Sequence, residues 1–395
     1  MKPAPTTPLQ AEASTTTPLQ ITPFEIAIPD SEIDDLHARL ERVRWPSSVP
    51  GSGWEYGLDL DTAKALVAYW RDGFDWRKQE QRLNRFPQFL TTIDNQTIHF
   101  IHVRSPEPEA QPLIMTHGWP STFADFAELI GPLTDPRRYG GDPADAFDVV
   151  IPSIPGFGFS GPTIEPGWDS ARIAKAWDTL MQGLGYSHYV AHGGDAGSFI
   201  TREMGIAKPA GLRAIHVLEI FAFPTGVPGE LDDLTESEKS QMAFMAGFNE
   251  HSCHQGVHQK RPLTLAYGLT DSPVGQLAWI VDPMKGLGRY APPEPHDRDV
   301  VLTNVSLYWF TRTAESSARW YLEDARSGAG GAEAMNTVPT GVALFPYNLL
   351  SIRKIAERAN NIVHWKHYDR GGHFAAIDVP MLLVEDLREF FRRFR

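Results

Sequence analysis

The stretch Ser187-His-Tyr-Val-Ala-His-Gly-Gly-Asp-Ala-Gly-Ser-Phe-Ile200 is the point from which the rest of the sequence is interpreted. A short apolar, β-prone run at 189–191 leads into two glycines and one acidic residue, and small and apolar residues follow. This order predicts a strand, a very tight turn and the start of a helix, because glycine tolerates turns in which a Cβ atom would clash. Asp195 is therefore presented at the tip of a strand-to-helix turn.

Two interpretations of Asp195 are open at this point. The segment 193–197 has the G-x-nucleophile-x-G form of a nucleophile elbow, with aspartate in the place where esterases carry serine. An aspartate in a Gly-rich turn can equally cap the helix that follows. Other parts of the chain must distinguish a nucleophile from a cap.

Composition limits the class of protein. The chain has 395 residues, 42% of them hydrophobic, and a formal net charge of −13, which argues against nucleic acid or an anionic membrane as the main partner. No run of about 18 apolar residues predicts a membrane span, and the N-terminus lacks the apolar region of a secretory signal. The lone Cys253 excludes an internal disulfide. We expect a cytoplasmic protein without a metal or cofactor, and a homodimer is one of the oligomeric states left open.

The order of predicted elements divides the chain into four parts. Residues 1–22 are expected to form a flexible arm, and 23–88 a helical segment, rich in tryptophan, that wraps the next part. Strands then alternate with helices over 89–220 and 332–395, which predicts a mostly parallel sheet covered by helices on both faces. Aromatic-rich helical sequence at 221–331 interrupts this rhythm. We expect it to form a lid over the carboxyl ends of the strands, where active sites of α/β proteins lie.

Eight strands are predicted for the sheet. The first two form a hairpin around Asp94-Asn95. The expected strands are 89–93, 97–103, 113–116, 148–154, 189–191, 214–220, 342–345 and 362–368.

Two further motifs follow strands, where chemistry around Asp195 would need them. His117-Gly-Trp-Pro120 can provide a backbone N–H, assigned to Trp119, which together with the N–H of Ala196 would form an oxyanion hole. Gly371-Gly-His-Phe374 places His373 on a glycine-rich loop after the last strand, where the imidazole can activate water.

With these motifs, the sequence resembles the microsomal type of epoxide hydrolase, a family with the α/β-hydrolase fold and an N-terminal cap domain. The similarity covers nearly all of residues 23–395. The motifs that carry it, besides those already quoted, are Trp54-Glu-Tyr-Gly57, Phe74-Asp-Trp-Arg77, Leu83-Asn-Arg-Phe-Pro87, Asp271-Ser-Pro-Val-Gly275, Leu302-Thr-Asn-Val305 and GGHFAA at 371–376.

The resemblance implies a two-step reaction on a mostly apolar epoxide, and a role in the detoxification of foreign compounds. The Asp195 carboxylate would attack an epoxide carbon and form an ester, while donors in the lid protonate the ring oxygen. Water activated by His373 would then attack the ester carbonyl and release a vicinal diol.

The first departure from the family pattern concerns the partner of His373. The family usually places an Asp or Glu after the penultimate strand, and the matching residue here is Asn348. An amide can orient an imidazole but cannot neutralise an imidazolium. Glu219, at the end of the strand after the nucleophile, resembles the acid of relatives that supply it there. We therefore expect the relay to run to Glu219 instead of Asn348; the alternative is a surface Glu at a strand end.

The second departure concerns the lid, where the family usually has two tyrosines. One matches Tyr321, but the other falls near His254. We assign His254 as the second donor and leave His251 and His258 open. The three histidines share one helical face, which could instead be a polar lid surface or a metal site.

Apolar lid side chains are expected to form the walls of the substrate cavity: Phe244, Met245, Phe248, Trp279 and Trp309. A dehalogenase would share the nucleophile, His373 and the position of Glu219. Dehalogenases, however, usually carry Trp or Arg directly after the nucleophile, and this chain has Ala196. A non-catalytic ligand-binding protein on the same fold is the third hypothesis.

Overall fold

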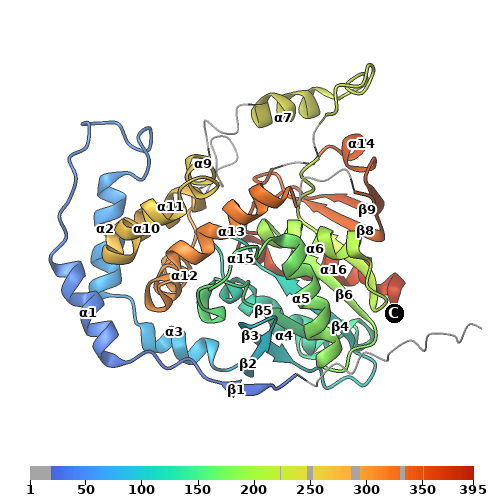
Figure 1. Ribbon diagram of the computed structural model, residues 1–395, viewed down its shortest axis with the longest axis horizontal. Helices are drawn as coiled ribbons and strands as arrows, with labels where there is room; N and C mark the ends of the chain where they lie inside the picture. The colour runs from blue at the N-terminus through green and yellow to red at the C-terminus, as the bar shows by residue number, and fades with distance from the viewer. Residues whose placement is uncertain (1–18, 223, 247–251, 286–293, 330–333, 350) are drawn as a thin grey trace, which may run out of the picture.

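The computed structural model describes residues 19–395 apart from 223, 247–251, 286–293, 330–333 and 350 (Figure 1). One sheet runs through it in the strand order β1-β2-β3-β5-β4-β6-β7-β8-β9. The strands are β1 (Thr22–Phe24), β2 (Gln88–Ile93), β3 (Gln96–Val103), β4 (Gln111–Thr116), β5 (Phe147–Pro152), β6 (Tyr189–Gly193), β7 (Leu212–Val217), β8 (Asn336–Leu344) and β9 (Asn360–His367).

The sheet has nine strands, so the prediction of eight was wrong by one. The additional strand, β1, lies where the sequence predicted the arm and a helical segment, and it pairs antiparallel with β2 from Thr22↔Leu90 to Phe24↔Gln88. Three residues are too few to show an alternating pattern. The strand forms because β2 leaves an unpaired edge that a neighbouring extended segment can cover.

The other eight strands lie close to their predicted positions. The β2–β3 hairpin turns at Asp94 and Asn95, which both have positive φ angles of 50° and 61°. β3 pairs antiparallel with β5, and from β5 to β9 all pairings are parallel. Nearly every residue of β4–β7 is buried, as expected for strands covered on both faces.

Helices cover both faces of the sheet and one edge. They are α1 (Asp30–Glu41), α2 (Leu60–Asp72), α3 (Trp76–Leu83), α4 (Ala127–Thr134), α5 (Ser170–Gly183), α6 (Ala196–Ala207), α7 (Glu236–Ala246), α9 (Cys253–His258), α10 (Pro262–Asp271), α11 (Pro273–Met284), α12 (Arg298–Thr311), α13 (Ala314–Ser327), α14 (Arg353–Ala356), α15 (Ala375–Asp378) and α16 (Pro380–Phe391). Among the described helices, none has the length and apolar character that crossing a bilayer requires.

Neighbouring residues of β7 show which helix covers which face. A Cβ atom on Gly205 of α6 would contact Ile215, whereas the ring of His216 lies 5.8 Å from that of Phe390 in α16. Since consecutive strand residues point to opposite faces, α6 and α16 lie on opposite sides of the sheet. This is the layered arrangement that the alternation of strands and helices predicted.

The tryptophan-rich N-terminal segment braces the helices that lie over the sheet edge. The Trp70 indole N–H donates to Ser306 Oγ at 3.0 Å, and the Tyr69 hydroxyl donates to Asp299 Oδ1 at 2.7 Å. Trp76 packs on Phe310 with ring centroids 4.9 Å apart. In Figure 1, α1 and α2 (blue) lie beside α10–α12 (yellow to orange). The N-terminal segment therefore fixes the position of α12, one of the helices that cover the candidate active site.

Candidate active site

The turn between β6 and α6 projects Asp195 from the carboxyl edge of the sheet. Asp195 has φ 55° and ψ −124°, a conformation that few non-glycine residues adopt and that active-site residues often hold. A Cβ atom on Gly193 would meet the Gly197 carbonyl, and one on Gly197 would meet the Thr116 carbonyl. The glycines therefore permit the sharp turn. The Asp195 side chain accepts no capping hydrogen bond from the residues that follow Ala196 in α6, so the cap interpretation of this residue is wrong.

The Asp195 carboxylate is held as an anion by three groups. The Trp119 N–H donates to Oδ1 at 2.8 Å, and His373 Nε2 lies 3.3 Å from Oδ2. Burial alone would raise the pKa of Asp195, but His373, Trp119 N–H and Ala196 N–H together hold the pKa below its ordinary value of 3.8. The two N–H groups assigned from the sequence to an oxyanion hole thus both contact this carboxylate.

The imidazole of His373 is oriented directly by Asn348. His373 Nδ1 donates to Asn348 Oδ1 at 2.8 Å, and Asn348 Nδ2 donates to Glu219 Oε2 at 2.9 Å. Glu219 Oε1 in turn accepts the backbone N–H of Asp195. The expectation that the relay passes to Glu219 instead of Asn348 was therefore wrong. The two residues act in series, because the amide occupies the space between the carboxylate and the imidazole.

The charge of Glu219 nevertheless reaches His373. Burial would lower the pKa of His373, but the hydrogen bond to Asp195 and the charges of Glu219 and Asp195 raise it to about 9. Glu219 is only 2% exposed, so the alternative of a surface Glu at a strand end is wrong. The raised pKa favours the imidazolium form of His373, whose Nε2 lies 3.3 Å from Asp195 Oδ2.

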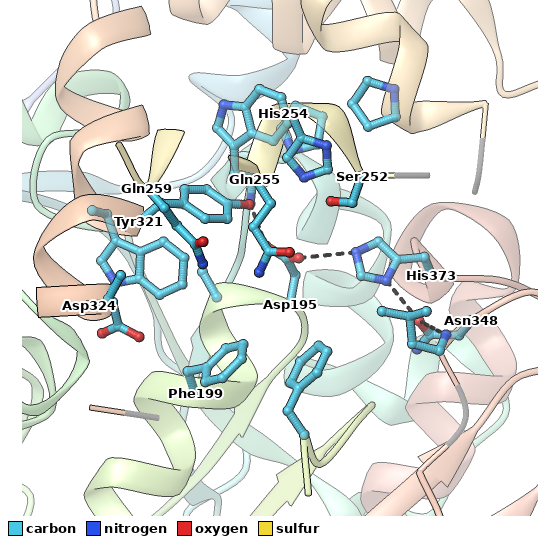
Figure 2. A pocket seen from close by; sticks show the side chains of 18 of the residues that line it. Asp195, Phe199, Ser252, His254, Gln255, Gln259, Tyr321, Asp324, Asn348 and His373 are labelled. Atoms are coloured by element: carbon cyan, nitrogen blue, oxygen red, sulfur yellow. Dashed lines mark hydrogen bonds and ion pairs between the residues drawn. The ribbon is translucent and has the colours of Figure 1, made fainter. Parts of the chain in front are cut away.

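In Figure 2, Tyr321 on α13 lies on the side of Asp195 opposite His373, and His254 on α9 lies above Asp195. The ring of His254 stacks on Trp119 with centroids 4.8 Å apart and lies 6.1 Å from the ring of Tyr321. Burial lowers the pKa of His254 to about 4 and, together with the charge of Asp195, raises that of Tyr321 well above 10.0. Both side chains are therefore neutral hydrogen-bond donors near the carboxylate.

The neighbouring histidines are placed differently. His258 Nε2 accepts the indole N–H of Trp279 at 2.8 Å, which commits this imidazole to packing within the lid. His251 lies outside the described residues. Of the two histidines that were candidates for the second lid donor and that the structure describes, His254 lines the cavity and His258 does not.

The cavity above Asp195 has a volume of about 460 Å³. Met245 lines it as expected, but Phe244, Trp279 and Trp309 are not among the described residues of its wall, and Phe248 lies outside the described residues. Trp309 is buried against the body of the protein, with the Arg39 guanidinium 5.7 Å from its ring. The prediction was wrong for these tryptophans because an aromatic lid helix has one face toward the cavity and another toward its neighbours.

The sequence reasoning missed the apolar side chains that do line the cavity. The rings of Phe199 and Phe221 stack 4.5 Å apart. Phe199 follows Asp195 by four residues in α6, so helical spacing was the signal that could have found it. The other apolar wall residues include Trp320, Leu349 and Phe374.

Comparison with known proteins agrees with this geometry. The family model described as epoxide hydrolase N terminus matches residues 21–126, and that described as alpha/beta hydrolase fold matches residues 111–250. The chain is 44% identical to a putative epoxide hydrolase of Stigmatella aurantiaca, over 95% of this chain and 86% of the relative. It is 34% identical to epoxide hydrolase 1 of Sus scrofa, over 94% of this chain and 88% of the relative.

Solved structures with similar folds include two epoxide hydrolases. The Aspergillus niger epoxide hydrolase is 30% identical, with a TM-score of 0.84 over 96% of this chain and 97% of that chain. The juvenile hormone epoxide hydrolase of Bombyx mori is 25% identical, with a TM-score of 0.86 and 95% of each chain covered.

The ion pair between Asp195 and His373 predicts how the imidazole titrates. In Asp195→Asn the carboxylate charge is lost while burial remains, so the pKa of His373 should fall from about 9 toward or below 6.5. The imidazole resonance can be followed by NMR and assigned through its absence in His373→Gln. Glu323→Gln, which removes a carboxylate without contact to the pair, is the control that should leave the midpoint unchanged. A midpoint still near 9 in Asp195→Asn would contradict the ion pair.

Proposed function

The chain belongs to the epoxide hydrolase family and has the α/β-hydrolase fold, and from this premise we propose that it opens epoxides through a covalent ester on Asp195. The observation that carries the proposal is the surroundings of one carboxylate. Two backbone N–H groups and His373 hold it on one side, while Tyr321 and His254 face it across the cavity. Such a site can supply a nucleophile, an acid and a base to one small molecule.

In the first step, Asp195 attacks one carbon of the epoxide. Oδ1 is engaged by Trp119 N–H, so Oδ2 is the oxygen that forms the new C–O bond. The bond between that carbon and the ring oxygen breaks. The ring oxygen takes a proton from Tyr321 while His254 donates a hydrogen bond, since neutral donors stabilise the charge that develops there.

In the second step, His373 becomes the general base. Esterification removes the charge of Asp195, which is a principal cause of the raised pKa of His373, so the imidazolium gives up a proton, and this restores the proton that Tyr321 lost in ring opening. The neutral imidazole takes a proton from water as the water oxygen bonds to the ester carbonyl carbon. Negative charge then develops on Oδ1, where Trp119 and Ala196 N–H groups stabilise it. On collapse, the bond between the carbonyl carbon and Oδ2 breaks, and the departing oxygen takes the proton of the new carboxyl group, which releases the diol and restores the Asp195 carboxylate.

Asn348 and Glu219 together perform two functions that a single carboxylate could perform: one orients the imidazole and the other supplies negative charge. Asn348 holds the imidazole by Nδ1, and so directs Nε2 toward Asp195. Glu219 provides the negative charge that stabilises the imidazolium formed in the second step. Asn348 and Glu219 are positioning residues, because neither contacts the reacting atoms.

Dehalogenation is not favoured. The relatives that cover most of this chain are epoxide hydrolases, and Ala196 offers a halide only its backbone N–H. The inferred partners are an epoxide and water, with the cytoplasm as the compartment, and a homodimer stays an open inference.

Turnover of two substrate classes tests the activity. Styrene oxide should give its vicinal diol with the wild type and none above background with Asp195→Asn, and 1-chlorobutane should release no halide. Diol can be measured by chromatography and halide by ion analysis. Halide release without diol would contradict the proposal.

The rate of ring opening tests whether Tyr321 and His254 act as donors to the ring oxygen. In Tyr321→Phe the acid is lost, so the rate of ester formation should fall at least about tenfold, with a smaller loss in His254→Phe. Rapid-mixing kinetics separate ester formation from ester hydrolysis. Tyr308→Phe is the matched control, because the Tyr308 hydroxyl donates to the Ser121 carbonyl and does not line the cavity. Unchanged ester formation in Tyr321→Phe would remove this residue from the mechanism.

Moving the negative charge from position 219 to position 348 tests the roles proposed for Glu219 and Asn348. Glu219→Gln removes the charge and replaces one of the two acceptor oxygens, which accept from Asp195 N–H and Asn348 Nδ2, by an NH2 donor, so ester hydrolysis should slow about ten- to a hundredfold. Adding Asn348→Asp to Glu219→Gln should restore hydrolysis, since it places a carboxylate directly on Nδ1. Asn348→Asp alone should not match this double variant, because two carboxylates would then lie within hydrogen-bonding distance. Wild-type hydrolysis in Glu219→Gln would contradict the division of roles.

A further inference from the structure

The cavity above Asp195 has a second polar region that the hydrolysis does not use. It is formed by Asp324 on α13, Gln255 on α9 and Gln259 just after α9, all of which line the cavity. From this arrangement we propose, on the basis of the proposed function, that Asp324 binds an ammonium group on the substrate. The preferred substrates are then epoxides that carry an amine.

Asp324 presents to the cavity a carboxylate that no described side chain of opposite charge neutralises. Oδ1 accepts the backbone N–H of Ser170 at 2.8 Å, which ties α13 to the start of α5, and the Ser170 side chain also stabilises the ionised carboxylate. Among the described residues, no Lys, Arg or His forms a salt bridge with Asp324, although it is only 8% exposed. A nearly enclosed carboxylate without a cation lacks the pairing that buried charges normally have. A cationic ligand that enters the cavity can supply it.

The neighbouring Glu323 has the same bracing role without access to the cavity. Glu323 Oε2 accepts the Gly167 N–H at 2.9 Å, and the residue is 9% exposed and does not line the cavity. Both carboxylates therefore hold α13 against the loop and helix start at 167–170. What distinguishes Asp324 is that it also lines the cavity.

The electrostatic surroundings favour a cation over a neutral donor. Burial first, and then the charges of Asp169 and Glu203, raise the pKa of Asp324 to about 7. Asp169 lies at the start of α5 and Glu203 on α6, so carboxylates surround Asp324 from two helices besides its own, which adds Glu323. An ammonium group in this region would be attracted by several negative charges and would stabilise the ionised form of Asp324.

The two glutamines extend the polar region toward the reacting carbon. In the view of Figure 2, the amide of Gln259 lies between Asp324 and Asp195, and the amide of Gln255 lies next to Asp195. Neither side-chain amide is hydrogen-bonded to another described residue, so their carbonyl oxygens are available to an N–H or C–H group beside a positive charge. They form a polar strip along one side of an otherwise aromatic cavity.

Asp324 and Tyr321 place the ammonium and epoxide groups at two ends of one substrate. Tyr321, the proposed ring-opening acid, precedes Asp324 by three residues on α13, so both side chains leave the helix on the same side. A phenyl ring can serve as the spacer between the two groups. The aromatic rings of Phe199 and Trp320 line the cavity and would contact this spacer.

A pair of isosteric substrates tests the proposal. One is 4-(dimethylaminomethyl)styrene oxide, which carries a tertiary ammonium group, and the other is 4-isobutylstyrene oxide, which has the same shape without the charge. At about pH 8, where Asp324 with its pKa of about 7 is ionised, the wild type should favour the amine in kcat/KM by at least about tenfold. In Asp324→Asn, which keeps the acceptor for Ser170, this ratio should fall to near one.

Glu323→Gln is the matched control, since it removes the neighbouring charge on the same helix and should keep the wild-type ratio. Inhibition of the wild type provides a readout that does not depend on a variant: N,N-dimethylbenzylamine should compete at least about tenfold better than isobutylbenzene. A wild-type ratio near one, equal inhibition by the two compounds, or an unchanged ratio in Asp324→Asn would overturn the ammonium site. Failure of both epoxides to give diol would instead count against the proposed function.

Discussion

The positive φ angle of Asp195 is the constraint on which the site depends. It turns the carboxylate out of the sheet and into contact with the Trp119 N–H, and it brings Ala196 N–H to the same group. Few side chains are tolerated in this conformation, and Gly193 and Gly197 remove the Cβ atoms that would prevent it. The backbone around one residue thus determines where the proposed nucleophile, the two N–H groups and His373 meet.

A second set of contacts fixes helix α12 of the predicted lid against the rest of the protein. Asn304 on α12 donates to Asp125 Oδ1 at 2.7 Å and accepts from Thr122 at 2.6 Å, which joins the lid to the loop after the oxyanion motif. Trp70 holds α12 from the opposite direction through Ser306. A lid fixed on two sides can position its donors without reorganisation when substrate binds, and such preorganisation is an established source of catalytic power.

Local sequence was sufficient to predict some residues of the site and insufficient to predict the others. Asp195, Trp119 and Ala196 belong to short motifs whose geometry is set by adjacent residues, so they could be predicted. Asn348 and Glu219 come from loops that follow different strands, and only the folded chain shows that the amide lies between Glu219 and His373. The cavity wall was predicted poorly, because composition identifies an aromatic lid but does not show which face of each helix turns inward. Asp324 belongs to no recognisable sequence motif, so the sequence did not single it out.

The central claim is that Asp195 forms a covalent ester and that water attacks its carbonyl carbon. A single turnover of styrene oxide in H2¹⁸O, with enzyme in excess, tests this most directly. Mass analysis of the peptide that contains Asp195 should find one ¹⁸O atom in the carboxylate, and the diol from that turnover should be unlabelled. A labelled diol with an unlabelled Asp195 would mean that water attacks the epoxide itself, and would contradict the account.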